Sequence, residues 1–123
     1  MTVSLHNITV DCADAKALGA FWSALTGWHL FHDEDPEVLV AQSYPPTSFP
    51  TMLFIPVPEG KTAKNRMHLD LDTDDLVAAR ARLEALGASF VHEKEEFGIH
   101  WLTFREPEGN EFCAGVHPPP GQG

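Results

Sequence analysis

The sequence feature that most constrains the fold is an internal repeat. The segment Val10–Asp14 is followed by a helical pattern that closes at Gly27, and the segment Leu71–Asp75 is followed by one that closes at Gly87. The two copies are offset by 61 residues at their start and by 60 at the closing glycine. A strand and a helix repeated at this spacing predict two modules of the same topology.

The first copy predicts one helix and four strands. Residues 3–12 alternate apolar and polar side chains, as a strand with one buried face does. Asp14 is a plausible helix N-cap, and Leu18, Phe21, Trp22 and Leu25 then recur at helical spacing. Three further strands are predicted at 28–31, 38–42 and 52–57.

The second copy repeats this order. Residues 66–73 predict a strand, and Leu76–Leu86 predicts a helix. Strands are expected at 89–92, 99–104 and 111–116, with a turn at Glu106–Asn110 between the last two. The acidic runs Asp33–Glu37 and Glu93–Glu96 are interpreted as solvated turns, although they would also suit a cationic ligand.

These elements predict an α+β protein with two tandem βαβββ modules, residues 3–57 and 66–116. A unit of about 60 residues is marginal alone, so residues 1–116 are expected to form one domain. Residues 117–123, rich in Pro and Gly, are expected to be a flexible tail.

Charge and composition exclude several functions. The net charge of −10 has the wrong sign for nucleic acid. No stretch approaches the roughly 20 continuous apolar residues of a membrane-spanning helix. The two cysteines, Cys12 and Cys113, are too few for a disulfide scaffold and are expected to be reduced. The amino terminus lacks the pattern of a secretory signal, so we expect a cytoplasmic location.

Strand alternation places three polar sets away from the predicted helices. These sets are Asn7, Thr9 and Asp11; His68, Asp70 and Asp72; and Glu111 with Cys113. A solvated sheet face is one interpretation of them. The other is a divalent metal site, because His68 and Glu111 with one more donor such as Cys113 would form a mixed-ligand triad with open positions.

Four segments together resemble the vicinal oxygen chelate superfamily, which includes glyoxalase I, fosfomycin-resistance enzymes, extradiol dioxygenases and bleomycin-resistance proteins. They are Leu5–Asp14, Phe21–Trp28, His68–Asp75 and Glu106–Cys113, and the resemblance covers nearly all of residues 3–116. Residues 61–71 with 109–113 resemble, more narrowly, the glyoxalase-like domain proteins of bacteria.

This resemblance implies two modules whose curved mixed sheets enclose a cleft, and a homodimer. In metal-dependent members the cleft holds a divalent ion, which here could be Zn, Fe, Mn, Ni or Mg, or be absent. His68 matches a ligand position of the superfamily, since it lies seven residues before the helix-opening Asp75. The other two positions depart from the pattern, because they fall on Asn7 and on Cys113, with Glu111 two residues early.

Further polar residues are candidates for substrate binding. Lys61, Lys64 and Arg66 precede the His68 strand and could bind an anionic group, although solvated loop charges are the favoured interpretation. His100 and Trp101 are adjacent in one strand, so one of them should face the cleft. The predicted substrate-binding set is Asn7, Thr9, Asp11, Asp70, His100, Lys61 and Arg66.

Two functions are compatible with these residues. The first is a metal-assisted lyase, isomerase or dioxygenase step on a small molecule, with His68 and Glu111 as the catalytic residues. The second is metal-free sequestration of a cationic antibiotic, as the resemblance to bleomycin-resistance proteins implies and the charge of −10 favours.

Overall fold

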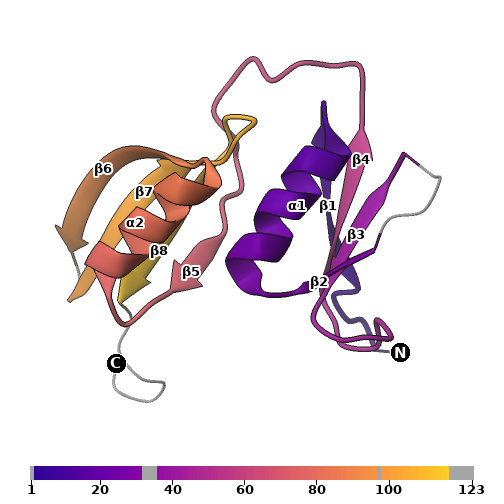
Figure 1. The fold of residues 1–123 in the computed structure, drawn as a ribbon, viewed down its shortest axis with the longest axis horizontal. Coiled ribbons are helices and arrows are strands. Elements are labelled where there is room, and N and C mark those ends of the chain that lie inside the picture. Colours follow the sequence, from indigo (N-terminus) through magenta and orange to yellow (C-terminus); the bar gives the residue numbers. More distant parts are fainter. Residues whose placement is uncertain (1, 32–35, 97, 117–123) are drawn as a thin grey trace. The chain divides into compact units, whose positions relative to one another are not determined.

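The computed structural model describes residues 2–31, 36–96 and 98–116, which belong to two compact units divided in the sequence between Lys61 and Thr62. Each unit holds one helix and a four-stranded mixed sheet, and neither sheet closes (Figure 1). The predicted α+β class and the two repeated modules are therefore confirmed. The predicted tail at 117–123 and most of the acidic segment 33–37 lie outside the described residues.

The first unit follows the predicted order of elements. They are β1 (Asn7–Cys12), α1 (Ala15–Thr26), β2 (His29–Phe31), β3 (Val38–Ala41) and β4 (Thr51–Pro56). The sheet order is β1-β4-β3-β2, with β1 parallel to β4 and the other pairs antiparallel.

Helix α1 packs its apolar side on this sheet. Asp14 caps its start by accepting a hydrogen bond from the backbone N–H of Ala17 at 3.0 Å. Gly27 ends it with a φ of 76°, a left-handed conformation that glycine adopts without strain. Leu18 on the helix and Phe54 on β4 are fully buried in the core between them.

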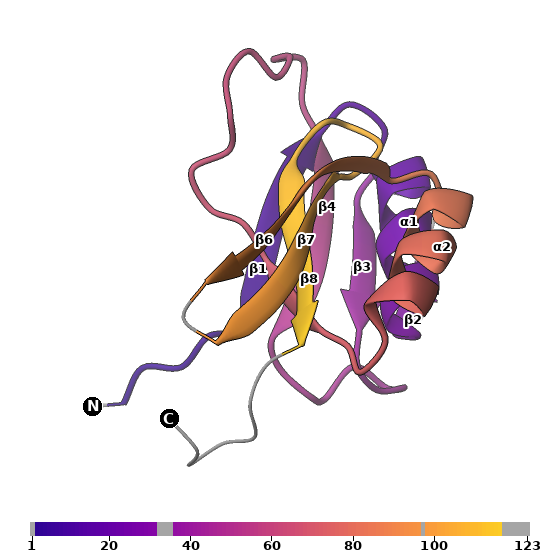
Figure 2. The ribbon, with the colours of Figure 1, turned by 90° about the vertical axis from the view of Figure 1, so that its left-hand side faces the viewer.

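The second unit repeats this arrangement. Its elements are β5 (Asp70–Asp72), α2 (Leu76–Leu86), β6 (Ser89–Glu96), β7 (Ile99–Arg105) and β8 (Glu111–Val116). The sheet order is β5-β8-β7-β6, again with one parallel pair, β5 and β8. Figure 2 shows β6, β7 and β8 side by side with α2 along one face.

The caps and the core of the second unit match those of the first. Asp75 accepts from the N–H of Ala78 at 3.0 Å, and Gly87 ends α2 with a φ of 112°. Leu83 of α2 packs over the sheet, where the rings of Phe104 and Phe112 stack 5.7 Å apart. The equivalence of Asp14 with Asp75 and of Gly27 with Gly87 confirms the repeat read from the sequence.

Strand β5 is much shorter than the predicted 66–73. Before it begins, the side chain of Asn65 takes the place of backbone pairing with the start of β8. Asn65 Oδ1 accepts from the N–H of Glu111 at 2.8 Å, and its Nδ2 donates to the Glu111 carbonyl at 3.1 Å. The backbone N–H and carbonyl of Glu111 are thus both hydrogen-bonded to the side-chain amide of Asn65 and not to a neighbouring strand. The regular ladder begins where the Cys113 N–H donates to the Leu69 carbonyl.

Two other predicted boundaries are wrong. Strand β1 begins at Asn7 rather than at residue 3, and its pairing with β4 starts where the Thr51 N–H donates to the His6 carbonyl. The run Glu93–Glu96 is not a turn, because all four residues pair with β7 as the end of β6. An edge strand tolerates such charges, which also discourage pairing with another chain.

No helix in the described part of the chain is long and apolar enough to cross a membrane.

Candidate functional site

A cavity of about 470 Å³ lies on the second unit. Alternate residues of β6, β7 and β8 line it, and the residues between them, such as Leu102 and Phe112, are buried toward α2. The cavity therefore lies on the face of the sheet away from the helix. It is lined by Lys64, His68, Asp70, His92, Lys94, Ile99, Trp101, Thr103, Glu111, Cys113 and Gly115.

Strand register arranges these residues in two rows across the sheet. Asp70, Cys113, Thr103 and His92 are consecutive partners from β5 to β6 and make up the first row. Gly115, Trp101 and Lys94 are partners in the second row. Because glycine has no side chain, Gly115 leaves the space beside Trp101 open.

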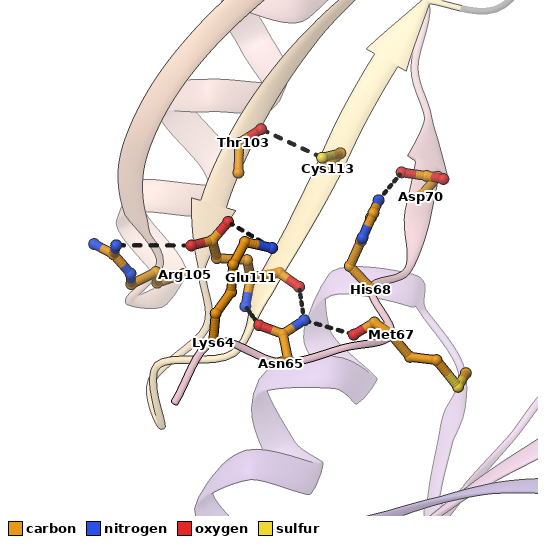
Figure 3. A network of polar contacts seen from close by, with 9 residues as sticks. All are labelled: Lys64, Asn65, Met67, His68, Asp70, Thr103, Arg105, Glu111 and Cys113. Carbon is orange, nitrogen blue, oxygen red and sulfur yellow. Dashed lines mark hydrogen bonds and ion pairs between the residues drawn. The ribbon is translucent and has the colours of Figure 1, made fainter. Parts of the chain in front are cut away.

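Three candidate metal ligands meet at one end of the first row. The donor atoms of His68, Asp70 and Cys113 all lie within 4.8 Å of one another. His68 Nε2 lies 3.6 Å from Asp70 Oδ1, and both side chains are about half exposed (Figure 3). The cluster has an imidazole, a carboxylate and a thiol, and its exposure leaves room for further ligands.

Cys113 is the most enclosed member of this cluster. Its Sγ lies 3.3 Å from Thr103 Oγ1, in a hydrogen bond between neighbouring strands. Partial burial raises the pKa of the thiol; the Thr103 hydrogen bond opposes this, and the charges of Asp70 and Glu111 add to it. A metal ion bound here must therefore displace a proton from sulfur.

Glu111 lines the cavity but lies outside this cluster. Its carboxylate faces two cations, with Lys64 Nζ at 3.6 Å from Oε1 and an Arg105 guanidinium nitrogen at 3.7 Å from Oε2 (Figure 3). The side chain is only 15% exposed, so the two cations offset the cost of burying its charge. Among the described residues, the third donor beside His68 and Cys113 is Asp70 rather than Glu111.

The segment that carries His68 is fixed by Asn65. Besides its two bonds to Glu111, the Asn65 amide donates to the carbonyl of Met67 (Figure 3). His68 follows directly, ahead of the first residue of β5. The sequence analysis missed Asn65, because an asparagine in a basic loop gives no periodic signal.

Register settles the orientation of His100 and Trp101. Trp101 lines the cavity, and His100 on the other face forms an ion pair with Glu93 at 3.2 Å. Two further cavity residues were not predicted: His92 because it has no companion pattern in the sequence, and Lys94 because β6 was expected to end at His92.

The other predicted substrate-binding residues lie elsewhere. Lys61 and Arg66 are exposed and do not line the cavity, although Lys64 between them does. Asn7, Thr9 and Asp11 lie on β1 of the first unit, where Asn7 Nδ2 donates to Thr9 Oγ1 at 2.8 Å. Their contribution to a site formed with the second unit stays a prediction.

The donor set fits a divalent transition metal. Imidazole nitrogen, carboxylate oxygen and thiolate sulfur are the three protein ligands of zinc, and catalytic zinc sites use three of them and leave a position open. A thiolate favours zinc, iron or cobalt over magnesium or manganese, which prefer oxygen.

The family of this chain is defined by its sequence. The profile of a family described as "Glyoxalase-like domain" matches residues 7–115, so the chain belongs to this family. The matched range contains every described element from β1 to β7 and nearly all of β8. No curated protein matches the sequence significantly.

Solved structures share the fold at low sequence identity. A glyoxalase/bleomycin resistance protein/dioxygenase family enzyme from Burkholderia phytofirmans has a TM-score of 0.75 at 15% identity, covering 93% of this chain and 98% of that one. A superfamily member from Sphaerobacter thermophilus has a TM-score of 0.68 at 21% identity, covering 94% and 98%.

A third similar structure contains ligands. It is a mutant fosfomycin resistance protein from Listeria monocytogenes in complex with Mn(II) and 1S,2S-dihydroxypropylphosphonic acid. It has a TM-score of 0.76 at 13% identity, covering 97% of this chain and 94% of that one. The chain thus shares its fold with these three solved structures.

Proposed function

We propose that the chain binds one divalent metal ion through His68, Asp70 and Cys113 and uses it in a lyase, isomerase or dioxygenase step on a small molecule in the adjoining cavity. The observation that carries this proposal is the meeting of three donor atoms within 4.8 Å at the cavity wall. The manganese-containing relative supports it, since that protein holds a metal on the same fold.

A metal bound at this cluster would act as a Lewis acid that polarises a substrate oxygen. The residues of the chain have separate tasks around it. Thr103 orients the sulfur of Cys113 through its hydrogen bond, and Asn65 holds the segment that presents His68. Glu111 lines the same cavity, and we propose that it acts on the substrate, as a group that accepts a proton, rather than on the metal.

The thiol narrows the choice of metal. A site with one sulfur, one nitrogen and one carboxylate oxygen favours zinc or iron among the divalent ions expected from the resemblance. Because the pKa of Cys113 is raised, metal binding should weaken as the pH falls and the proton competes for sulfur.

Metal titration of the full chain tests the proposal. After purification over a chelating resin, Co²⁺ should bind with 1:1 stoichiometry and give a thiolate-to-cobalt charge-transfer band. His68→Ala, Asp70→Asn and Cys113→Ser should each weaken binding by more than about tenfold, since each removes a direct ligand.

Glu111→Gln is the matched control for Asp70→Asn, because both replace a cavity carboxylate by its amide. It should leave cobalt affinity nearly unchanged. Absence of stoichiometric binding, or equal affinities in all four variants, would overturn the proposed site. Loss in Glu111→Gln but not in Asp70→Asn would replace Asp70 by Glu111 as the ligand.

The wider assembly is part of the same proposal. We propose that residues 1–116 act as a single domain, that the protein works as a homodimer in the cytoplasm, and that Asn7, Thr9 and Asp11 of β1 contribute to the ligand site. The family profile, which spans residues 7–115, supports the single domain. Size-exclusion chromatography with light scattering tests the dimer directly.

A further inference from the structure

We propose that the cavity selects a small organic oxyanion, such as a phosphate monoester or a carboxylate, whose charged group is bound by Lys94 and His92 of β6. The inference deepens the proposed function, because it gives the ligand class of the same cavity. It rests on residues that take no part in the metal cluster.

The charges of the cavity wall differ from those of the whole chain. The protein has 18 acidic and only 8 basic residues, yet its cavity is lined by two lysines, two histidines and two carboxylates. Of the carboxylates, Asp70 belongs to the metal cluster, and Glu111 already faces Lys64 and Arg105. The local charge is therefore not acidic.

Lys94 and His92 lie on the cavity face of β6, which Glu96, opposite Ile99, shares without lining the cavity. They alternate with Glu93 and Glu95, which lie on the other face, where Glu93 pairs with His100. Within the described ranges of the chain, no carboxylate forms an ion pair with Lys94. Its ammonium and the His92 imidazole can thus donate hydrogen bonds to a ligand.

The spacing of these groups fits a small molecule. Cys113 and His92 lie in the same row with only Thr103 between them, so two strand spacings, about 10 Å, separate their backbones. A ligand lying across β7 would have its oxyanion at β6 and its other end at the metal cluster. Trp101, the neighbour of Lys94, offers an apolar wall for the part in between.

Binding of simple probes to the metal-free chain tests this proposal. The protein is passed over a chelating resin, and calorimetry at constant ionic strength compares phenyl phosphate, inorganic phosphate and phenyltrimethylammonium. We expect phenyl phosphate to bind at least about tenfold more tightly than phenyltrimethylammonium, because only the anion can accept hydrogen bonds from Lys94.

Lys94→Gln should weaken phenyl phosphate binding by about tenfold, since it removes a charged donor. Lys16→Gln is the matched control, as it removes the same charge from an exposed position on α1, and it should change affinity less than twofold. His92→Gln should give a smaller loss than Lys94→Gln.

Equal affinities in Lys94→Gln and Lys16→Gln, a preference for the cation, or no binding of either aromatic probe would overturn the proposal. Preference for the cation would also favour sequestration of a cationic ligand. Cobalt titration of Lys94→Gln separates this outcome from failure of the metal site: the variant should bind cobalt like the wild type whichever probe the cavity prefers.

Discussion

Cys113 gives the site its chemical character. Its sulfur is a candidate ligand, and partial burial keeps the thiol protonated more firmly than a free cysteine. The Thr103 hydroxyl beside it lowers the cost of forming the thiolate. The raised pKa disfavours the thiolate in the metal-free protein, and the sulfur becomes a soft ligand when an ion displaces the proton.

Glu106 is a buried carboxyl that holds the turn before β8. One of its oxygens accepts from the N–H groups of Glu108 and Asn110, both at 2.9 Å. Burial nevertheless raises its pKa above the ordinary value, although these hydrogen bonds oppose the shift. The folded protein thus holds this proton more tightly than the unfolded chain does, so stability falls as the pH rises through this range.

Glu106→Gln keeps the acceptor oxygen and removes the charge. We expect its free energy of unfolding to match that of the wild type near pH 4 and to exceed it near pH 7, as measured by urea denaturation. Glu106→Ala is the control, since it removes the acceptor oxygen. It should be less stable than the wild type by about 1–2 kcal/mol at both pH values. A Gln variant less stable than the wild type at pH 7 would contradict this account.

At the scale of elements, the segment just before β5 is held to β8 by the side chain of Asn65 and not by backbone hydrogen bonds. Asn65→Ala should leave the N–H and carbonyl of Glu111 without partners and release the segment before His68. We expect a loss of about 1–3 kcal/mol in unfolding free energy and weaker cobalt binding.

Asn65→Asp is the informative companion of that variant. Aspartate still accepts from the Glu111 N–H but cannot donate to the carbonyls of Met67 and Glu111, so it should restore part of the stability and less of the metal affinity. Gln42→Ala is the control, since it removes an amide bond to the Pro50 carbonyl in the first unit. A cobalt affinity unchanged in Asn65→Ala would show that Asn65 does not position His68.

Alternation and turns explain how far the sequence could predict these elements. The caps, both helices and the cavity-facing parity of Glu111 and Cys113 follow from local patterns. Trp101 could also have been found, because a five-residue turn that pairs Arg105 with Glu111 places Trp101 beside Gly115. Lys94 was missed because acidic neighbours made the end of β6 resemble a turn.

The metal cluster could be predicted only in part, for a different reason. The sequence pattern places His68 and Cys113 at expected ligand positions. The choice between Asp70 and Glu111 depends instead on which cations form ion pairs with each carboxylate. Lys64 and Arg105 reach Glu111 from a loop and from β7, 41 residues apart in the sequence. No local pattern records such contacts.

At the scale of the whole molecule, the question is whether the two units unfold together. Each has a core of its own, centred on Leu18 and Phe54 in the first and on Phe104 and Phe112 in the second. A unit of about 60 residues buries too little surface for much independent stability. If residues 1–116 form one domain, a defect in either core should therefore destabilise both units equally.

Leu18→Ala and Leu83→Ala place matched cavities in the two cores, where the leucines are 0% and 2% exposed. Each should cost about 2–5 kcal/mol. Tryptophan fluorescence can follow each unit separately. In a Trp101→Phe background the signal comes from Trp22 and Trp28 in the first unit. In a background with both Trp22→Phe and Trp28→Phe it comes from Trp101 in the second unit. In a single cooperative domain, either leucine variant shifts both signals to the same lower urea midpoint. A shift confined to the unit that carries the cavity would mean that the two modules fold independently.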